Sequence, residues 1–139
     1  MLNSKFSPWP SYTCEEADAI SKVLLSNKVN YWTGHEGREF EKEFADFVGC
    51  NHAIAVANGT LALDLAFKAL GVGEGDEVIV TSRTFLASVS SIVLSGATPV
   101  FADVDEFLCL DVNSIRDRIT KKTKAMMFVG MGGSPGYLP

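Results

Sequence analysis

The segment Asn58–Thr60 is the part of the sequence best suited to bind an anion. It follows the apolar run Ala53–Val56, which predicts a short buried strand, and it opens the apolar pattern Thr60–Leu70, which predicts a helix. Amides of the turn and of the first helical turn point in one direction, and the helix dipole adds partial positive charge there. A phosphate can therefore bind without a basic side chain, and the Thr60 hydroxyl adds a donor. Because every helix start has free amides, the flanking sequence must decide whether this is an anion site.

Two further polar loops are predicted to meet this turn at one edge of a sheet. Ser82–Phe85 and Asp103–Asp105 each follow a predicted strand, and ligands of open parallel sheets bind at the carboxyl ends of the strands. Phe85 can anchor the next helix in the core or lie flat on a planar ligand, and its position alone favours core packing. Asp103 and Asp105 have the ligand type that Mg²⁺ prefers, but acids in such loops more often form turns and caps.

Other candidate motifs lack the spacing that their chemistry needs. The glycines of Gly71–Asp76 resemble a dinucleotide fingerprint but stand between a helix and the following strand, so they predict a helix end and a turn. His35 and His52 have no metal-ligand spacing, and no serine has a neighbouring histidine and acid. The three cysteines are far apart, which favours reduced thiols over a zinc site or disulfides: Cys14, Cys50 and Cys109. We assign no metal.

The elements that position these loops begin with two amphipathic helices. The first predicted helix spans residues 15–25 and follows a cap at Thr13. The second ends at Gly49 and carries charged residues 36–46 on a solvated face. Its other face has four apolar residues: Phe40, Phe44, Phe47 and Val48. Strands then alternate with helices, with strands at 53–56, 77–80, 99–102 and 125–129 and helices at 60–70, 84–94 and 112–119. This alternation predicts an α/β fold with an open, mainly parallel sheet and helices on both faces.

Composition narrows the class of protein. The 139 residues, 47% of them hydrophobic, suffice for one globular core, and a net charge of -5 argues against nucleic-acid binding. No apolar run reaches membrane-spanning length and Met1–Pro10 lacks a secretion signal, so we expect a cytoplasmic protein with no membrane partner. The last predicted strand runs into the Gly/Pro-rich loop 130–139, with no element to cover the sheet. We expect the front part of a longer protein.

Residues 31–105, from YWTGHEGREF to PVFADVD, closely resemble the front half of the large domain in the DegT/DnrJ/EryC1/StrS aminotransferases. These are fold-type I enzymes that use pyridoxal 5'-phosphate (PLP). The resemblance implies transfer of an amino group, usually from glutamate, to a keto group on a nucleotide-linked sugar, which supplies amino sugars for polysaccharide, glycolipid or antibiotic. It also implies a homodimer whose active sites are shared across the interface.

The resemblance assigns roles to particular residues. The turn that holds the cofactor phosphate matches Gly59, Thr60 and Leu61, in agreement with the anion-binding turn above. The aromatic residue that stacks on the pyridine ring matches Phe85, which outweighs the positional preference for core packing. A loop near the mouth of the active site and the dimer interface matches Trp32, Thr33 and Gly34.

The same resemblance implies how the chain is organised. Residues 1–50 are expected to form an N-terminal helical segment that packs on the large domain and at the dimer interface. Residues 51–139 are expected to form an incomplete PLP-binding large domain, with the C-terminal small domain absent.

Two catalytic groups of such enzymes have no match in this sequence. These are the lysine that forms a Schiff base with the cofactor and the aspartate that keeps its pyridine nitrogen protonated. Asp103 and Asp105 match a DVD turn rather than that aspartate. The lysines all stand at helical, terminal or pre-strand positions: Lys5, Lys22, Lys28, Lys42, Lys68, Lys121, Lys122 and Lys124. We therefore expect no catalytic residue in this chain and no transamination by it alone.

Departures from the family pattern keep two alternatives open. Arg83 stands where relatives often have an aromatic or small residue, and FVGMGGSPG at 128–136 replaces the commoner PVHLYGQ type of loop. These changes favour a divergent substrate, or a non-catalytic, regulatory paralogue that keeps only the cofactor seat or the dimer surface. A small Rossmann-like nucleotide binder is the third reading, and it has only the alternating pattern in its favour.

Overall fold

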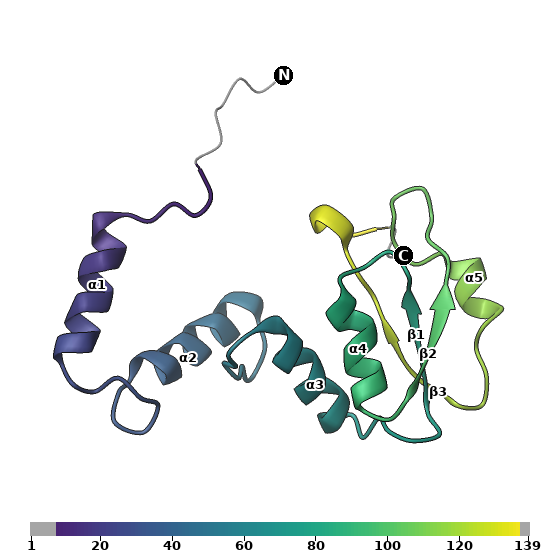
Figure 1. The fold of residues 1–139 in the computed structure, drawn as a ribbon, viewed down its shortest axis with the longest axis horizontal. Helices are drawn as coiled ribbons and strands as arrows, with labels where there is room; N and C mark the ends of the chain where they lie inside the picture. Colours follow the sequence, from purple (N-terminus) through teal and green to yellow (C-terminus); the bar gives the residue numbers. More distant parts are fainter. Residues whose placement is uncertain (1–7, 137–139) are drawn as a thin grey trace. The chain divides into compact units, whose positions relative to one another are not determined.

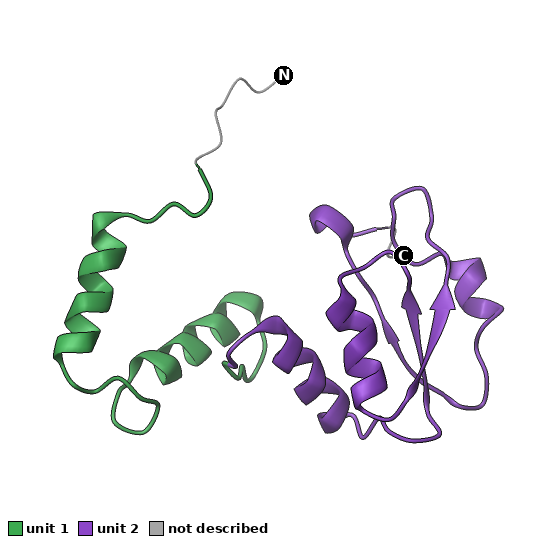
Figure 2. Cartoon of the chain, in the orientation of Figure 1, with its two compact units in different colours: residues 1–55 green, residues 56–139 purple. Residues whose placement is uncertain are grey.

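The computed structural model of the chain describes residues 8–136, which belong to two compact units, residues 1–55 and 56–139 (Figures 1 and 2). The first unit contains α1 (Cys14–Leu25) and α2 (Glu36–Val48). Thr13 caps α1 as predicted, in a reciprocal arrangement with Glu16, and Gly49 ends α2 in the left-handed conformation with φ 74°. The start of α1 and the end of α2 therefore lie where their local sequence signals stand.

The second unit is an α/β arrangement with a three-stranded, all-parallel sheet in the order β2-β1-β3 (Figure 1). This confirms the predicted α/β fold with an open parallel sheet. Its elements, in chain order, are α3 (Gly59–Ala69), β1 (Glu77–Thr81), α4 (Leu86–Leu94), β2 (Thr98–Ala102), α5 (Val112–Arg116), β3 (Thr123–Met127) and a short 3-10 helix, η1 (Met131–Gly133).

Apolar clusters cover both faces of the central strand β1. On one face Val78 and Val80 pack with Phe67 of α3 and Ile92 of α4. On the other face Ile79 packs with Ala102 and Leu110, and Val100 and Ile115 lie against that cluster. Val78, Ile79 and Val80 are completely buried, as expected for a parallel strand with helices on both faces.

The predicted strand at 53–56 is wrong: these residues form no strand, and Ile54 is 72% exposed. A strand needs a neighbour for its backbone groups. The N–H of Ala55 instead donates a hydrogen bond of 2.8 Å to Oε1 of Glu41, and the sheet consists of β1, β2 and β3. The segment is hydrophobic, as its pattern indicates, but it does not pair with another strand.

Two other predicted elements differ in extent. The helix predicted at 112–119 ends at Arg116, and the strand predicted at 125–129 lies at Thr123–Met127. The loop that follows contains η1, whose Gly132 has a φ of 62°. Positions 137–139 of the predicted terminal loop lie outside the described residues.

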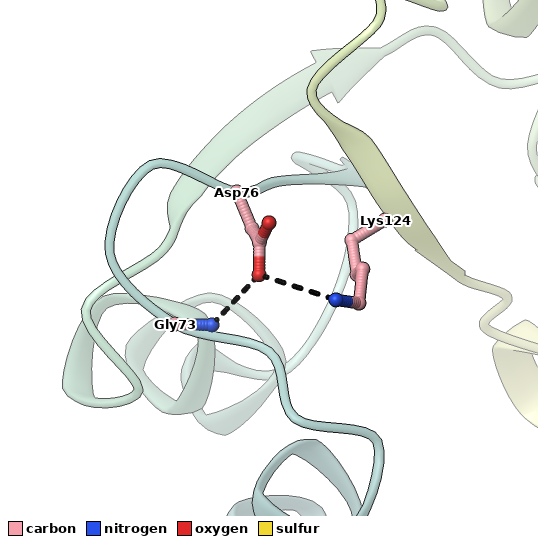
Figure 3. Close-up of polar contacts among 3 residues, drawn as sticks. All are labelled: Gly73, Asp76 and Lys124. Atoms are coloured by element: carbon pink, nitrogen blue, oxygen red, sulfur yellow. Dashed lines mark hydrogen bonds and ion pairs between the residues drawn. The ribbon is translucent and has the colours of Figure 1, made fainter.

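The segment Gly71–Asp76 is a helix end and a turn, as predicted. Gly71 follows the C-cap of α3 with φ 65°, a conformation that favours glycine. The N–H of Gly73 donates a hydrogen bond of 3.0 Å to Oδ2 of Asp76, and the same oxygen lies 3.9 Å from Nζ of Lys124 (Figure 3). This carboxylate thus connects the turn before β1 to strand β3.

No helix in the described part of the chain combines the length and apolar character that crossing a bilayer requires.

Candidate functional site

The N-terminal turn of α3 provides the amide donors that the sequence predicts. Oδ1 of Asn58, the N-cap, accepts a hydrogen bond of 3.0 Å from the N–H of Leu61. Gly59 and Thr60 occupy the first two helical positions, whose N–H groups have no intrahelical partner. Of the three residues predicted to contact a phosphate, Leu61 already donates its N–H to the Asn58 side chain. The amides of Gly59 and Thr60 are left to bind a ligand.

Space for a ligand exists beside this turn. A Cβ built on Gly59 meets no heavy atom within 4 Å, so the backbone faces open space there. Thr60 is half-buried. The absence of a side chain at Gly59 lets a group approach the amides closely.

The loop after β1 places Phe85 directly before α4. Phe85 is 76% exposed, so it does not pack in the core as its position alone would suggest. The loop is held by the N–H of Arg83, which donates to Oγ1 of Thr81 at 3.0 Å, and by a 2.8 Å hydrogen bond between the hydroxyls of Thr84 and Ser88. An exposed aromatic ring on a loop fixed at both ends can receive a planar group without displacing core contacts.

The α3 turn and Phe85 stand at corresponding ends of two packed helices. α3 contacts α4, and residues from the C-terminal halves of both helices line one cavity. The two helices therefore run in the same direction, and their N-termini, with Gly59 and Phe85, lie toward the same end. α4 is the crossover helix between the parallel strands β1 and β2, and α3 packs beside it.

Asp103 and Asp105, after β2, are turn residues. Oδ1 of Asp105 accepts hydrogen bonds from the N–H groups of Phe107 at 2.9 Å and Cys109 at 3.0 Å. Oδ1 of Asp103 accepts from the N–H of Val104 at 2.8 Å. These bonds to nearby backbone amides fit the turn role that the sequence favours for both carboxylates.

The loop with Trp32, Thr33 and Gly34 belongs to the first unit. Oδ1 of Asn30 accepts hydrogen bonds of 3.0 Å from the N–H groups of Trp32 and Thr33. A Cβ at Gly34 would clash with the carbonyl oxygen of Lys28, so the loop requires glycine at this position. Trp32 is 85% exposed on a loop with a fixed backbone.

Glu41 is a connecting residue that the sequence did not indicate. Its Oε2 accepts a hydrogen bond of 3.0 Å from the hydroxyl of Tyr31, and its Oε1 binds the Ala55 amide. The bond to Glu41 raises the pKa of Tyr31, because ionisation would remove the donor proton. The sequence pattern places Glu41 on a solvated charged face, and no local spacing signal distinguishes it from its neighbours.

Asp64 and Ser91 were also missed. Both line a cavity between α3 and α4, and each has a buried side-chain oxygen without a hydrogen-bond partner in the described structure. The available sequence signal was a single acid inside the apolar pattern of residues 61–67.

The lysines of the described residues are all exposed: Lys22, Lys28, Lys42, Lys68, Lys121, Lys122 and Lys124. Lys5 lies outside the described residues. None of the seven has the buried surroundings of a nucleophilic lysine.

Comparisons with known proteins agree with this geometry. The profile of the DegT/DnrJ/EryC1/StrS aminotransferase family matches residues 10–139. The chain is 44% identical over 131 residues to GDP-perosamine synthase of Escherichia coli O157:H7. This match covers 91% of this chain and 35% of the relative. It is 45% identical over 120 residues to the spore coat polysaccharide biosynthesis protein SpsC of Bacillus subtilis, covering 86% of this chain and 30% of that protein.

Solved structures show the same relationship. An aminotransferase from Psychrobacter cryohalolentis matches with a TM-score of 0.91 and 59% identity, over 94% of this chain and 33% of that one. A 3-amino-5-hydroxybenzoic acid synthase matches with a TM-score of 0.87 and 38% identity, over 94% of this chain and 34% of that one. The chain thus spans about a third of the length of these relatives. The profile match over nearly all of its residues shows that this chain belongs to the DegT/DnrJ/EryC1/StrS family of PLP-dependent aminotransferases.

Proposed function

We propose that this chain carries the phosphate and ring seat for PLP in an aminotransferase that acts on a nucleotide-linked keto sugar. The observation that carries the proposal is the α3 N-terminus, where the amides of Gly59 and Thr60 have no intrahelical partner and the backbone of Gly59 faces open space. The phosphate of PLP would bind these amides and the Thr60 hydroxyl. Leu61 would contribute its N–H in exchange for the hydrogen bond to Asn58.

Phe85 would hold the plane of the cofactor ring. Its exposed side chain stands at the start of α4, whose first turns are packed in the core through Ala87 and Ser88. A ring fixed in this way restricts the orientation of a stacked partner, which aligns the reacting bond with the ring system. When bound, PLP supplies an electron sink that stabilises negative charge at the substrate carbon.

Proton transfer at that carbon needs a lysine, and the described lysines of this chain are all exposed. We therefore propose that the chain alone binds the cofactor without transaminating. A non-catalytic or regulatory role that keeps only the cofactor seat or the dimer surface is the second candidate, and the same observation favours it.

The substrate proposal draws on the relatives. GDP-perosamine synthase points to a nucleotide-linked sugar, with glutamate as the proposed amino donor. The similar 3-amino-5-hydroxybenzoic acid synthase is named for a product that is not a sugar. We place Trp32, Thr33 and Gly34 near the substrate and at the interface of a homodimer. Residues 1–50 would pack on the large domain, of which residues 51–139 form part, in a cytoplasmic protein.

Binding of pyridoxamine 5'-phosphate and of pyridoxamine tests the cofactor seat. Both compounds lack the aldehyde that reacts with surface lysines, and they differ only in the phosphate. We expect the phosphorylated compound to bind at least about tenfold more tightly in a fluorescence titration, since charge-assisted hydrogen bonds contribute about 1.5–3 kcal/mol. Equal affinities would remove the proposed phosphate seat.

Matched variants assign the contacts. T60V and F85A should each weaken binding of the phosphorylated compound several-fold, whereas T98V and F107A, which alter exposed residues of the same types, should leave it unchanged. Borohydride treatment in the presence of PLP should then label no single lysine stoichiometrically. A single labelled lysine would contradict the proposed lack of transaminating chemistry.

A further inference from the structure

Residues 130–136, which follow β3, fold back onto the loop between β2 and α5. Both segments leave the sheet at the carboxyl ends of parallel strands, the edge at which ligands of open α/β sheets bind. Figure 1 shows η1 and the β2–α5 loop at the end of the sheet toward which the strand arrows point. The segment 130–136 also belongs to the loop that departs from the family pattern.

The contact between the two segments centres on Cys109, which is 1% exposed. A Cβ built on Gly136 would lie 2.9 Å from both Cβ and Sγ of Cys109 and 3.1 Å from the Phe128 ring. The backbone of Gly136 therefore lies directly against these two side chains. Sγ of Cys109 is 3.8 Å from the carbonyl oxygen of Ser134, within reach of a weak S–H donor. The Cys109 backbone is fixed in turn by two hydrogen bonds with Asp105, of 3.0 and 2.8 Å.

The segment 130–136 has few attachments outside itself. Its backbone hydrogen bonds are internal, such as the 3.1 Å bond from the N–H of Gly133 to the carbonyl of Gly130. Within residues 8–136, the hydrogen bond that joins the segment to the rest of the chain is that of the Cys109 thiol. Gly132 and Gly133 have left-handed φ values of 62° and 83°. A segment with so few contacts opens at a low free energy, and such glycines suit a hinge.

We propose that residues 130–136 are a lid that swings about Gly130–Gly133 and closes by seating Gly136 on Cys109. The open lid exposes the Cys109 thiol while the strands stay paired, because the pairing of β1 with β3 ends at Met127, before the hinge. The inference goes beyond the proposed function: it involves none of the residues of the proposed PLP seat, and its test requires no cofactor.

Pulse labelling with iodoacetamide and peptide mass spectrometry of the full 139-residue chain measures the opening. The chain carries its own references, since Cys14 and Cys50 are exposed and Cys109 is buried. Each rate is divided by that of the same cysteine in the urea-unfolded chain, which removes differences in intrinsic reactivity. We expect Cys109 to react at least about tenfold more slowly than the two references. Low urea concentrations should hardly change its rate, because a local opening exposes little surface.

Two results of this measurement would overturn the proposal. A normalised rate equal to those of Cys14 and Cys50 would show that the segment 130–136 does not cover Cys109. A rate that rises with urea as steeply as global unfolding would show that the thiol is exposed only when the sheet unfolds.

The variants G136A and G71A separate the lid from a general loss of stability. Both glycines have a left-handed φ, 62° and 65°, so alanine strains the backbone similarly at either position. A Cβ at position 136 meets Cys109, whereas one at position 71 meets no heavy atom within 4 Å. We expect G136A to raise the normalised rate of Cys109 several-fold and G71A to leave it unchanged. An equal rise in both variants, or no rise in G136A, would also overturn the proposal.

Discussion

At the scale of single residues, Asp76 shows how one carboxylate serves two contacts of unequal strength. Its hydrogen bond with the N–H of Gly73 has an ordinary length of 3.0 Å and fixes the turn, whereas its ion pair with Lys124 is 3.9 Å long and partly exposed (Figure 3). We predict that D76A lowers the free energy of unfolding by about 1–2 kcal/mol, and that K124A lowers it by at most about 0.5 kcal/mol. Urea denaturation of both variants measures the difference, and equal losses would contradict this ranking.

Glu41 gives a second prediction at this scale, through the ionisation of Tyr31. The hydrogen bond to Glu41 raises the pKa of Tyr31 above its ordinary value of 10.0. A raised pKa in the folded state means that this bond stabilises the protein below pH 10 and is lost as the pH rises through the raised value. We predict that E41A lowers the pKa of Tyr31, because alanine cannot accept the hydrogen bond, and the ring-carbon resonances of labelled tyrosine follow the change. An unchanged pKa in E41A, with E39A as the control, would show that the bond does not form in solution.

At the scale of elements, α1 depends on a titratable cap. Oε2 of Glu16 accepts hydrogen bonds from the N–H of Thr13 at 2.6 Å and from its hydroxyl at 2.9 Å, and the backbone hydrogen bond is the main cause of the lowered pKa of Glu16. A carboxyl pKa that is lower in the folded state stabilises the helix above the ordinary value of 4.5, and this contribution disappears as the pH falls through the lowered value.

We predict that α1 loses amide protection on acidification below pH 4.5. E16Q should remove much of this pH dependence while keeping the helix, because a glutamine amide can replace the carboxylate in a capping box without titrating. Hydrogen exchange at α1 as a function of pH measures the effect, and E15Q provides the matched control in the same helical turn. Identical pH profiles for E16Q and the unaltered chain would contradict the role of this cap.

The elements also show what a single sequence can predict. α1 and α2 were predicted because their signals, the Thr13 cap and Gly49 with apolar residues at helical spacing, are local. The segment 53–56 was wrongly predicted as a strand. Its apolar residues satisfy the pattern of a strand, but strand pairing depends on residues far away in the chain. Glu41 was missed for the same reason: its role arises from a hydrogen bond to the distant Ala55 and leaves no spacing signal.

At the scale of the whole molecule, the described chain exposes many large apolar side chains. On α2 the rings of Phe40 and Phe44 contact each other, with centroids 5.8 Å apart, yet both are exposed, as is Phe47. The sequence pattern correctly predicted an apolar face on this helix, but nothing in a pattern says whether such a face packs within the chain or against another molecule. Clustered exposed apolar groups favour association because their burial releases water.

We therefore predict that the chain self-associates in a concentration-dependent manner and that α2 contributes to the contact. F40Q/F44Q should shift the mass distribution toward the monomer in size-exclusion chromatography with light scattering, because the substitution removes apolar area while keeping good helix formers. E43Q, which changes an exposed charged residue of the same helix, should leave the distribution unchanged. Association that persists in F40Q/F44Q would place the contact on another exposed surface, and a chain that stays monomeric at all concentrations would show that these aromatic side chains tolerate exposure to water.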